Sequence, residues 1–203
     1  MSETFIHRFE PGVEGETRTL LLLHGTGGDE NDLIPLGQTV LPGAAILSPR
    51  GRVFEGDFPR FFRRFAEGVF DLENLYAETA ALAEFVVEAA GRYAFDLRRI
   101  VALGFSNGAN MAHSLMMRHP NVVQDAVLIR AMTTLPELQP TGLEGKRVFL
   151  SSGKVDPMMP VDDVEFLANQ LRSGGADVTH HWVDAGHNLT RAELGTIHDW
   201  LAQ

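Results

Sequence analysis

The chain of 203 residues is long enough to bury a substantial core, and we expect one domain spanning residues 1–203. Its formal net charge of −10 argues against general nucleic-acid binding and against adhesion to an anionic membrane. The absence of cysteine excludes disulfides, thiolate metal ligands and a cysteine nucleophile. We find no secretory signal and no apolar run near the ~20 residues of a membrane span, so the sequence predicts a cytoplasmic protein.

The first third of the chain predicts strands of a sheet. Residues 4–9 and 44–47 are expected to be strands, and Thr19–Leu23 is a continuous apolar run that suits a strand covered on both faces. That run ends in His24-Gly25-Thr26-Gly27-Gly28-Asp29. Such a Gly-rich segment either brings backbone N–H groups close to a ligand or is a plain loop.

The connection over residues 52–71 is longer than usual between a strand and a helix, and it holds six of the 13 Phe residues and four Arg residues. Two interpretations are open. The Phe side chains could form the apolar wall of a binding site in which Arg60, Arg63 or Arg64 holds a substrate carboxylate or phosphate. Alternatively, the Phe residues complete the core and the Arg residues lie in water. After this connection, apolar residues at helical spacing from Leu75 to Ala89 predict an amphipathic helix.

The next segment combines a short apolar run over residues 100–103, the sequence Gly104-Phe105-Ser106-Asn107-Gly108, and a helical pattern that ends near Pro120. A Ser between a strand and a helix, with Gly two residues to either side, is the pattern of a nucleophile elbow. The tight turn strains the backbone of the Ser and exposes its hydroxyl beside the N-terminus of the helix. The alternative is a Gly-rich turn that only packs closely.

Strands and helices continue to alternate through the rest of the chain. Strands are expected over residues 125–129, 147–151 and 178–183, with a loop over 133–146 and a helix from Val164 to Leu171. The last helix opens with Thr190 and Glu193, the spacing of a capping box. This alternation predicts a three-layer α/β domain with a mostly parallel central sheet.

A serine nucleophile needs a base that takes its proton and a carboxylate that orients the base. In this class of fold the order along the chain is Ser, acid, His, and both partners lie in loops after strands, at the carboxyl edge of the sheet. Asp156 and His187 satisfy both conditions, whereas Asp184 is a rival acid only three residues from His187. The backbone N–H groups of Asn107 and Thr26 are the expected donors to the oxyanion.

Four segments, LLLHGTGGDENDL, GFSNGANMA, GKVDPMMP and AGHNL, occur in the order found in a known family. On them the chain resembles the small bacterial phospholipase/carboxylesterase family of the α/β-hydrolase superfamily, which includes acyl-protein thioesterases. The resemblance implies an α/β-hydrolase fold, and we expect no large cap domain in a chain of this length. It also implies a Ser-Asp-His esterase with no cofactor or metal, often a homodimer. Carried over by position, Ser106 is the nucleophile, Asp156 the acid and His187 the base.

The sequence therefore predicts a serine carboxylesterase that hydrolyses small carboxylic esters or thioesters through an acyl-enzyme intermediate. Its expected partner is a small-molecule ester, with neither nucleic acid nor membrane involved. Two alternatives stay open. One is an acyl transferase or perhydrolase that uses the same three residues, and the other is a noncatalytic protein that binds small ligands on this scaffold.

Overall fold

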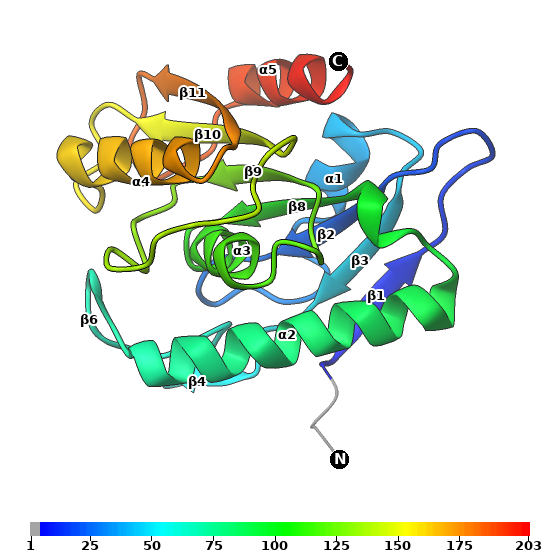
Figure 1. Ribbon diagram of the computed structural model, residues 1–203, viewed down its shortest axis with the longest axis horizontal. Coiled ribbons are helices and arrows are strands. Elements are labelled where there is room, and N and C mark those ends of the chain that lie inside the picture. Colours follow the sequence, from blue (N-terminus) through cyan, green and yellow to red (C-terminus); the bar gives the residue numbers. More distant parts are fainter. Residues whose placement is uncertain (1–4) are drawn as a thin grey trace.

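The computed structural model describes residues 5–203, so Thr4, where the first predicted strand begins, lies outside the described residues. Within that range seven strands form one sheet in the order β1-β3-β2-β8-β9-β10-β11 (Figure 1). β1 pairs antiparallel with β3, and every other neighbouring pair in this sheet is parallel. The bounds are β1 His7–Glu10, β2 Thr19–Leu23, β3 Ala45–Pro49, β8 Ile100–Phe105, β9 Asp125–Ile129, β10 Arg147–Gly153 and β11 Asp177–Val183.

The interior strands form where the sequence is continuously apolar. β2 and β9 have the predicted bounds, and every residue of both is buried, as expected for strands covered on two faces. β11 lies at the edge of the sheet and is half-buried along most of its length. The mostly parallel three-layer α/β architecture predicted from the alternation of elements is therefore confirmed.

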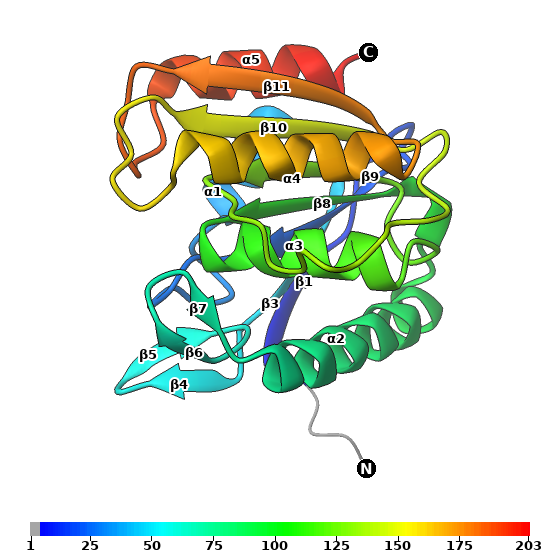
Figure 2. The same ribbon diagram turned by 60° about the vertical axis from the view of Figure 1, so that its left-hand side comes forward.

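Helices cover both faces of the sheet. One layer of the core joins the sheet to α2, α3 and α4, and the other joins it to α1 and α5. Figures 1 and 2 show these two groups on opposite sides of the sheet. No helix in the described part of the chain is long and apolar enough to cross a membrane. The bounds are α1 Ile34–Val40, α2 Leu72–Tyr93, α3 Asn107–Arg118, α4 Val161–Ser173 and α5 Arg191–Leu201, with a short 3₁₀ turn at Leu97–Arg99.

The ends of two helices show how the sequence sets their boundaries. Asp71 caps α2 by accepting the N–H of Asn74. At the start of α5 the predicted capping box is present: the Thr190 side chain accepts the N–H of Glu193, and the Glu193 carboxylate accepts the N–H of Thr190. Helix α1 was not predicted, because its seven residues include Pro35 and Gly37 and give too short a pattern.

Residues 52–71 are not an open loop but two antiparallel hairpins, β4 (Val53–Glu55) with β5 (Phe58–Arg60) and β6 (Arg64–Ala66) with β7 (Val69–Phe70). Figure 2 shows both hairpins beside the start of α2, on the side toward which the parallel strands point. The interpretation that Phe residues of this segment complete the core holds for two of them. Phe61 and Phe62 are fully buried in the core, whereas the side chains of three others lie largely in solvent: Phe54, Phe58 and Phe65.

Candidate active site

Ser106 lies between β8 and α3 in a backbone conformation that few residues adopt. Its φ of 52° and ψ of −116° are in a strained region for a residue with a side chain. The flanking glycines are required by close packing. A Cβ at Gly104 would lie 2.6 Å from the Cα of Ala109, and a Cβ at Gly108 would lie 2.5 Å from the carbonyl oxygen of His24. The turn therefore holds the start of α3 against the ends of β8 and β2.

The structure brings the three predicted triad residues into one chain of hydrogen bonds. The Oγ of Ser106 lies 2.8 Å from Nε2 of His187, and Nδ1 of His187 lies 2.8 Å from Oδ2 of Asp156. Asp156 follows β10 and His187 follows β11, so both come from loops at the carboxyl edge of the sheet. The second carboxylate oxygen of Asp156 accepts the N–H of Met158 at 2.9 Å, which fixes the carboxylate in place.

Asp184, the rival acid, lies elsewhere. Its side chain is 87% exposed and pairs with Nζ of Lys154 at 2.8 Å. The Asp156 side chain, by contrast, is completely buried against the imidazole. The carboxylate that contacts His187 is thus that of Asp156, the acid that the sequence favours.

Two residues near Ser106 carry the backbone N–H groups that the sequence predicts as donors to an oxyanion. Thr26 and Asn107 line the same cavity as Ser106 and His187, and neither N–H has an acceptor among residues 5–203. His24 holds the Thr26 loop from behind, because its Nδ1 contacts the carbonyl of Gly25 at 2.7 Å and its Nε2 accepts the N–H of Gly51 at 2.9 Å. This bonding needs a neutral imidazole, and burial lowers the pKa of His24 accordingly.

A cavity of about 210 Å³ opens in front of these groups. Of the three arginines predicted to bind substrate, Arg60 and Arg64 line it. Arg63 does not line this cavity: its guanidinium is turned away and bonds to the Asp71 carboxylate at the start of α2. The second hairpin also contributes Glu67 and Phe70 to the cavity wall.

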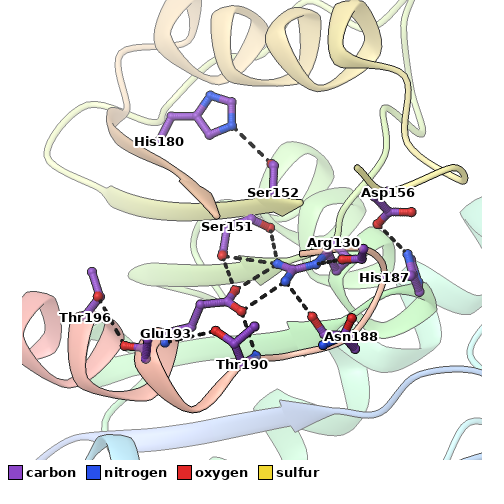
Figure 3. Close-up of polar contacts among 12 residues, drawn as sticks. Arg130, Ser151, Ser152, Asp156, His180, His187, Asn188, Thr190, Glu193 and Thr196 are labelled. Carbon is purple, nitrogen blue, oxygen red and sulfur yellow. Dashed lines mark hydrogen bonds and ion pairs between the residues drawn. The ribbon is translucent and has the colours of Figure 1, made fainter. Parts of the chain in front are cut away.

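Sequence reasoning missed Arg130, which follows β9 and is fully buried (Figure 3). Its Nε donates to the carbonyl of Gly186 at 2.9 Å and its Nη2 to the carbonyl of Asn188 at 2.6 Å. These two carbonyls lie on either side of His187. Arg130 therefore holds the loop of the imidazole at both flanks.

Arg130 is itself fixed by Glu193, which is equally buried. The two side chains form a bidentate pair, with Nη1–Oε1 at 2.9 Å and Nη2–Oε2 at 3.0 Å, and Ser151 adds a hydroxyl bond to Oε1 at 2.6 Å. Burial raises the pKa of Glu193, but the bonds from Arg130 and Ser151 outweigh it and lower the pKa overall. The N–H of Ser106 donates to the carbonyl of Ile129, the residue directly before Arg130, at 2.8 Å.

This arrangement can carry out nucleophilic chemistry at a carbonyl. A hydroxyl in contact with an imidazole can lose its proton to that imidazole, a buried carboxylate can orient the ring, and two free N–H groups can bind a developing oxyanion. Within the described residues, no group of three or more His, Cys, Asp or Glu side chains is placed to hold a metal ion.

Comparison with models of known protein families gives no match. The sequence is 40% identical over 197 residues to "Putative hydrolase MhqD" of Bacillus subtilis (strain 168), covering 97% of this chain and 98% of that protein. The fold is similar to that of a Bacillus cereus carboxylesterase, with a TM-score of 0.94 and 45% identity over 96% of this chain and 92% of that one. It is also similar to YahD, solved with malic acid, with a TM-score of 0.90 and 32% identity over 96% and 97% of the two chains.

Proposed function

This chain belongs to the phospholipase/carboxylesterase family of α/β-hydrolases, and on that premise we propose that it is a serine carboxylesterase acting on small carboxylic esters. One observation carries the proposal: Ser106, His187 and Asp156 are joined by two hydrogen bonds of 2.8 Å beside two unpaired backbone N–H groups. The names of the related proteins support hydrolase or esterase chemistry more broadly. YahD was solved with malic acid, which supports a small carboxylic acid or its ester as the kind of substrate that we propose.

In the proposed reaction, Ser106 Oγ attacks the acyl carbon of the ester while Nε2 of His187 takes the hydroxyl proton. The carbonyl oxygen becomes an oxyanion, and the N–H groups of Thr26 and Asn107 bind it. The intermediate collapses when His187 passes the proton to the departing alcohol, leaving an acyl-enzyme. Water, deprotonated by His187, then attacks the acyl carbon and releases the acid and the free serine. Throughout, Asp156 keeps Nδ1 of His187 protonated and the ring oriented.

A fluorophosphonate probe tests this proposal directly, because it labels only an activated serine. We expect stoichiometric labelling at Ser106 and turnover of an activated short ester. Both should be lost in Ser106→Ala, with kcat reduced by about 10⁶-fold, as for other triad serines. Asp156→Asn should reduce kcat by about 10⁴-fold. A wild-type protein that is neither labelled nor active on any short ester would contradict the proposal.

The chain offers a matched control for the serine. Ser152 Oγ also lies 3.1 Å from a histidine nitrogen, Nε2 of His180, but Ser152 is completely buried (Figure 3). Neither residue lines the cavity in front of Ser106. Ser152→Ala should leave labelling and kcat within about twofold of the wild type, since a serine-histidine contact without access or oxyanion donors is not sufficient. Product analysis with added alcohol or peroxide then shows whether water is the acyl acceptor, as we propose, or another nucleophile.

A further inference from the structure

Arg60 is a buried cation on the wall of the cavity, only 3% exposed. Its Nε donates to the carbonyl of Phe62 at 3.2 Å, and its Nη1 donates to Oγ1 of Thr26 at 2.6 Å. Its Nη2 has no acceptor within the described part of the chain. A guanidinium has five N–H donors and no acceptor, so it forms hydrogen bonds only with acceptor atoms such as carboxylate or carbonyl oxygens. Arg60 therefore has donor capacity left over, immediately beside the oxyanion donor Thr26.

Asn107 adds to the positive potential of the same wall. Its Oδ1 accepts the N–H of Phe61 at 2.8 Å, which fixes the orientation of the amide. Its Nδ2 is buried without an acceptor among residues 5–203, so the donor end of the amide dipole is uncompensated. The N-terminus of α3 begins at this residue and contributes the positive end of the helix dipole.

The carboxylates near Arg60 are more exposed than its guanidinium. The Glu55 and Glu67 side chains are 47% and 50% exposed, so solvent screens them. Glu55 lies 3.1 Å from Nη1 of Arg60 and also binds Arg64, which divides its charge between two cations. Burial and the charge of Arg64 lower the pKa of Arg60, against the opposing effect of Glu55 and Glu67. Of these four charged side chains, Arg60 is the most deeply buried and therefore the least screened by solvent.

The volume of the cavity limits what can bind there. Its roughly 210 Å³ is below the ~300–1,000 Å³ of sites that enclose drug-sized ligands. A short acyl group with one further polar group fits this space better than a fatty acyl chain.

We propose that Arg60 binds a carboxylate of the substrate, so that the preferred substrates are half-esters of short dicarboxylic acids. Hydrolysis of such an ester releases an alcohol and a dicarboxylate. This inference rests on the esterase function proposed above and names its substrate class. Arg60 is in this sense a specificity-determining residue.

The contact between Arg60 and Thr26 allows a second role, which the experiment must separate from the first. If Arg60 only strengthened the oxyanion site, its loss would slow neutral and anionic esters equally. If it binds a substrate carboxylate, its loss slows anionic esters selectively. The quantity to measure is therefore the ratio of kcat/KM for an anionic ester to that for its neutral counterpart.

The test uses monomethyl succinate, glutarate and adipate, each paired with the methyl ester of the matching half-amide, which has the same shape without the charge. In the wild type we expect the best anionic ester to be favoured about 10–100-fold, as for charge-assisted hydrogen bonds. Arg60→Met should bring the ratio to about one, mainly through KM, and Arg60→Lys should restore part of it. Arg63→Met is the matched control, because Arg63 is turned away toward Asp71, and it should keep the wild-type ratio.

Three results would overturn the inference: a wild-type ratio of one or less, equal loss on both esters in Arg60→Met, or an unchanged ratio in that variant. In the first and third cases, continued hydrolysis of the neutral ester and labelling of Ser106 would leave the esterase proposal standing. Binding gives a measurement that needs neither turnover nor a folded variant. Calorimetry on the wild type should show glutarate binding and no binding of glutaramide, and equal or absent binding of the two would also overturn the inference.

Discussion

Replacing Arg130 separates its contribution to stability from its contribution to the position of His187. Arg130→Met leaves the Glu193 carboxylate buried and unpaired, since both side chains are 0% exposed. Breaking a buried pair in this way costs about 3–5 kcal/mol. For a chain of this length each kcal/mol lowers Tm by about 2–4 °C, so we expect a loss of roughly 6–20 °C.

The double variant Arg130→Met with Glu193→Gln separates the loss of stability from the loss of His187 positioning. It removes both charges and keeps a side chain that can still form the capping box with Thr190. Because neither charge of this pair remains, most of the lost Tm should return. The carbonyls on either side of His187 nevertheless remain without their donor. A displacement of the imidazole by about 1 Å is enough to reduce kcat about 10²-fold.

The measurements are thermal unfolding and steady-state ester hydrolysis, with kinetics recorded below the lowest Tm of the series. We expect both Arg130 variants to have kcat lowered about 10–100-fold with KM little changed. Glu193→Gln alone should lower Tm with a smaller loss of kcat than either Arg130 variant. Arg147→Met is a control, because the Arg147–Asp125 pair is partly exposed and distant from the cavity, and its loss should cost about 1 kcal/mol or less. If the double variant recovered both Tm and kcat, the assigned role of Arg130 in positioning His187 would be wrong.

Three further predictions concern the fold. Gly108→Ala should prevent correct folding because its Cβ would overlap the end of β2. Gly91→Ala, where a Cβ meets open space on α2, should instead raise Tm by about 2–4 °C. Soluble yield and melting curves test both variants, and a stable Gly108→Ala protein would contradict the packing argument. Burial lowers the pKa of His113 to about 3 and that of His180 to about 4. Below about pH 6.5 the unfolded chain therefore binds protons that the folded chain does not, and Tm should fall as the pH decreases from about 6.5 to 4. A Tm that does not change over this pH range would refute this prediction. Thr190→Ala removes the cap of α5 and should lower the free energy of unfolding by about 1 kcal/mol in denaturant titrations, whereas an unchanged midpoint would show that the cap contributes little.

The elements that the sequence predicts well are those whose residues are uniformly buried or strongly periodic. β2 and β9 are apolar from end to end, and α2 repeats its apolar face over six turns. The hairpins of residues 52–71 were not predicted, because strands of two or three residues are too short to show an alternating pattern. Whether each of their Phe side chains is buried or exposed depends on tertiary contacts, which the local sequence pattern does not show.

The candidate site was predictable to the extent that its residues follow strands in a fixed order. Ser106, Asp156 and His187 could be placed together because parallel strands end at the same edge of a sheet. Arg130 could not be found in this way. A single arginine after a buried strand carries no motif, and its partners lie 21 to 63 positions farther along the chain. Arg60 and Arg63 differ only by their neighbours in space, which spacing along the chain does not reveal.

The step from Ile129 to Arg130 has a mechanical consequence for the whole site. The main chain of Ile129 fastens the nucleophile, and the side chain of the next residue fastens the loop of the base. The positions of both reactive atoms therefore depend on two consecutive residues, the last residue of β9 and the one after it. When the sheet flexes or twists, we therefore expect the serine and the imidazole to move together, which would keep the distance between them short enough for proton transfer.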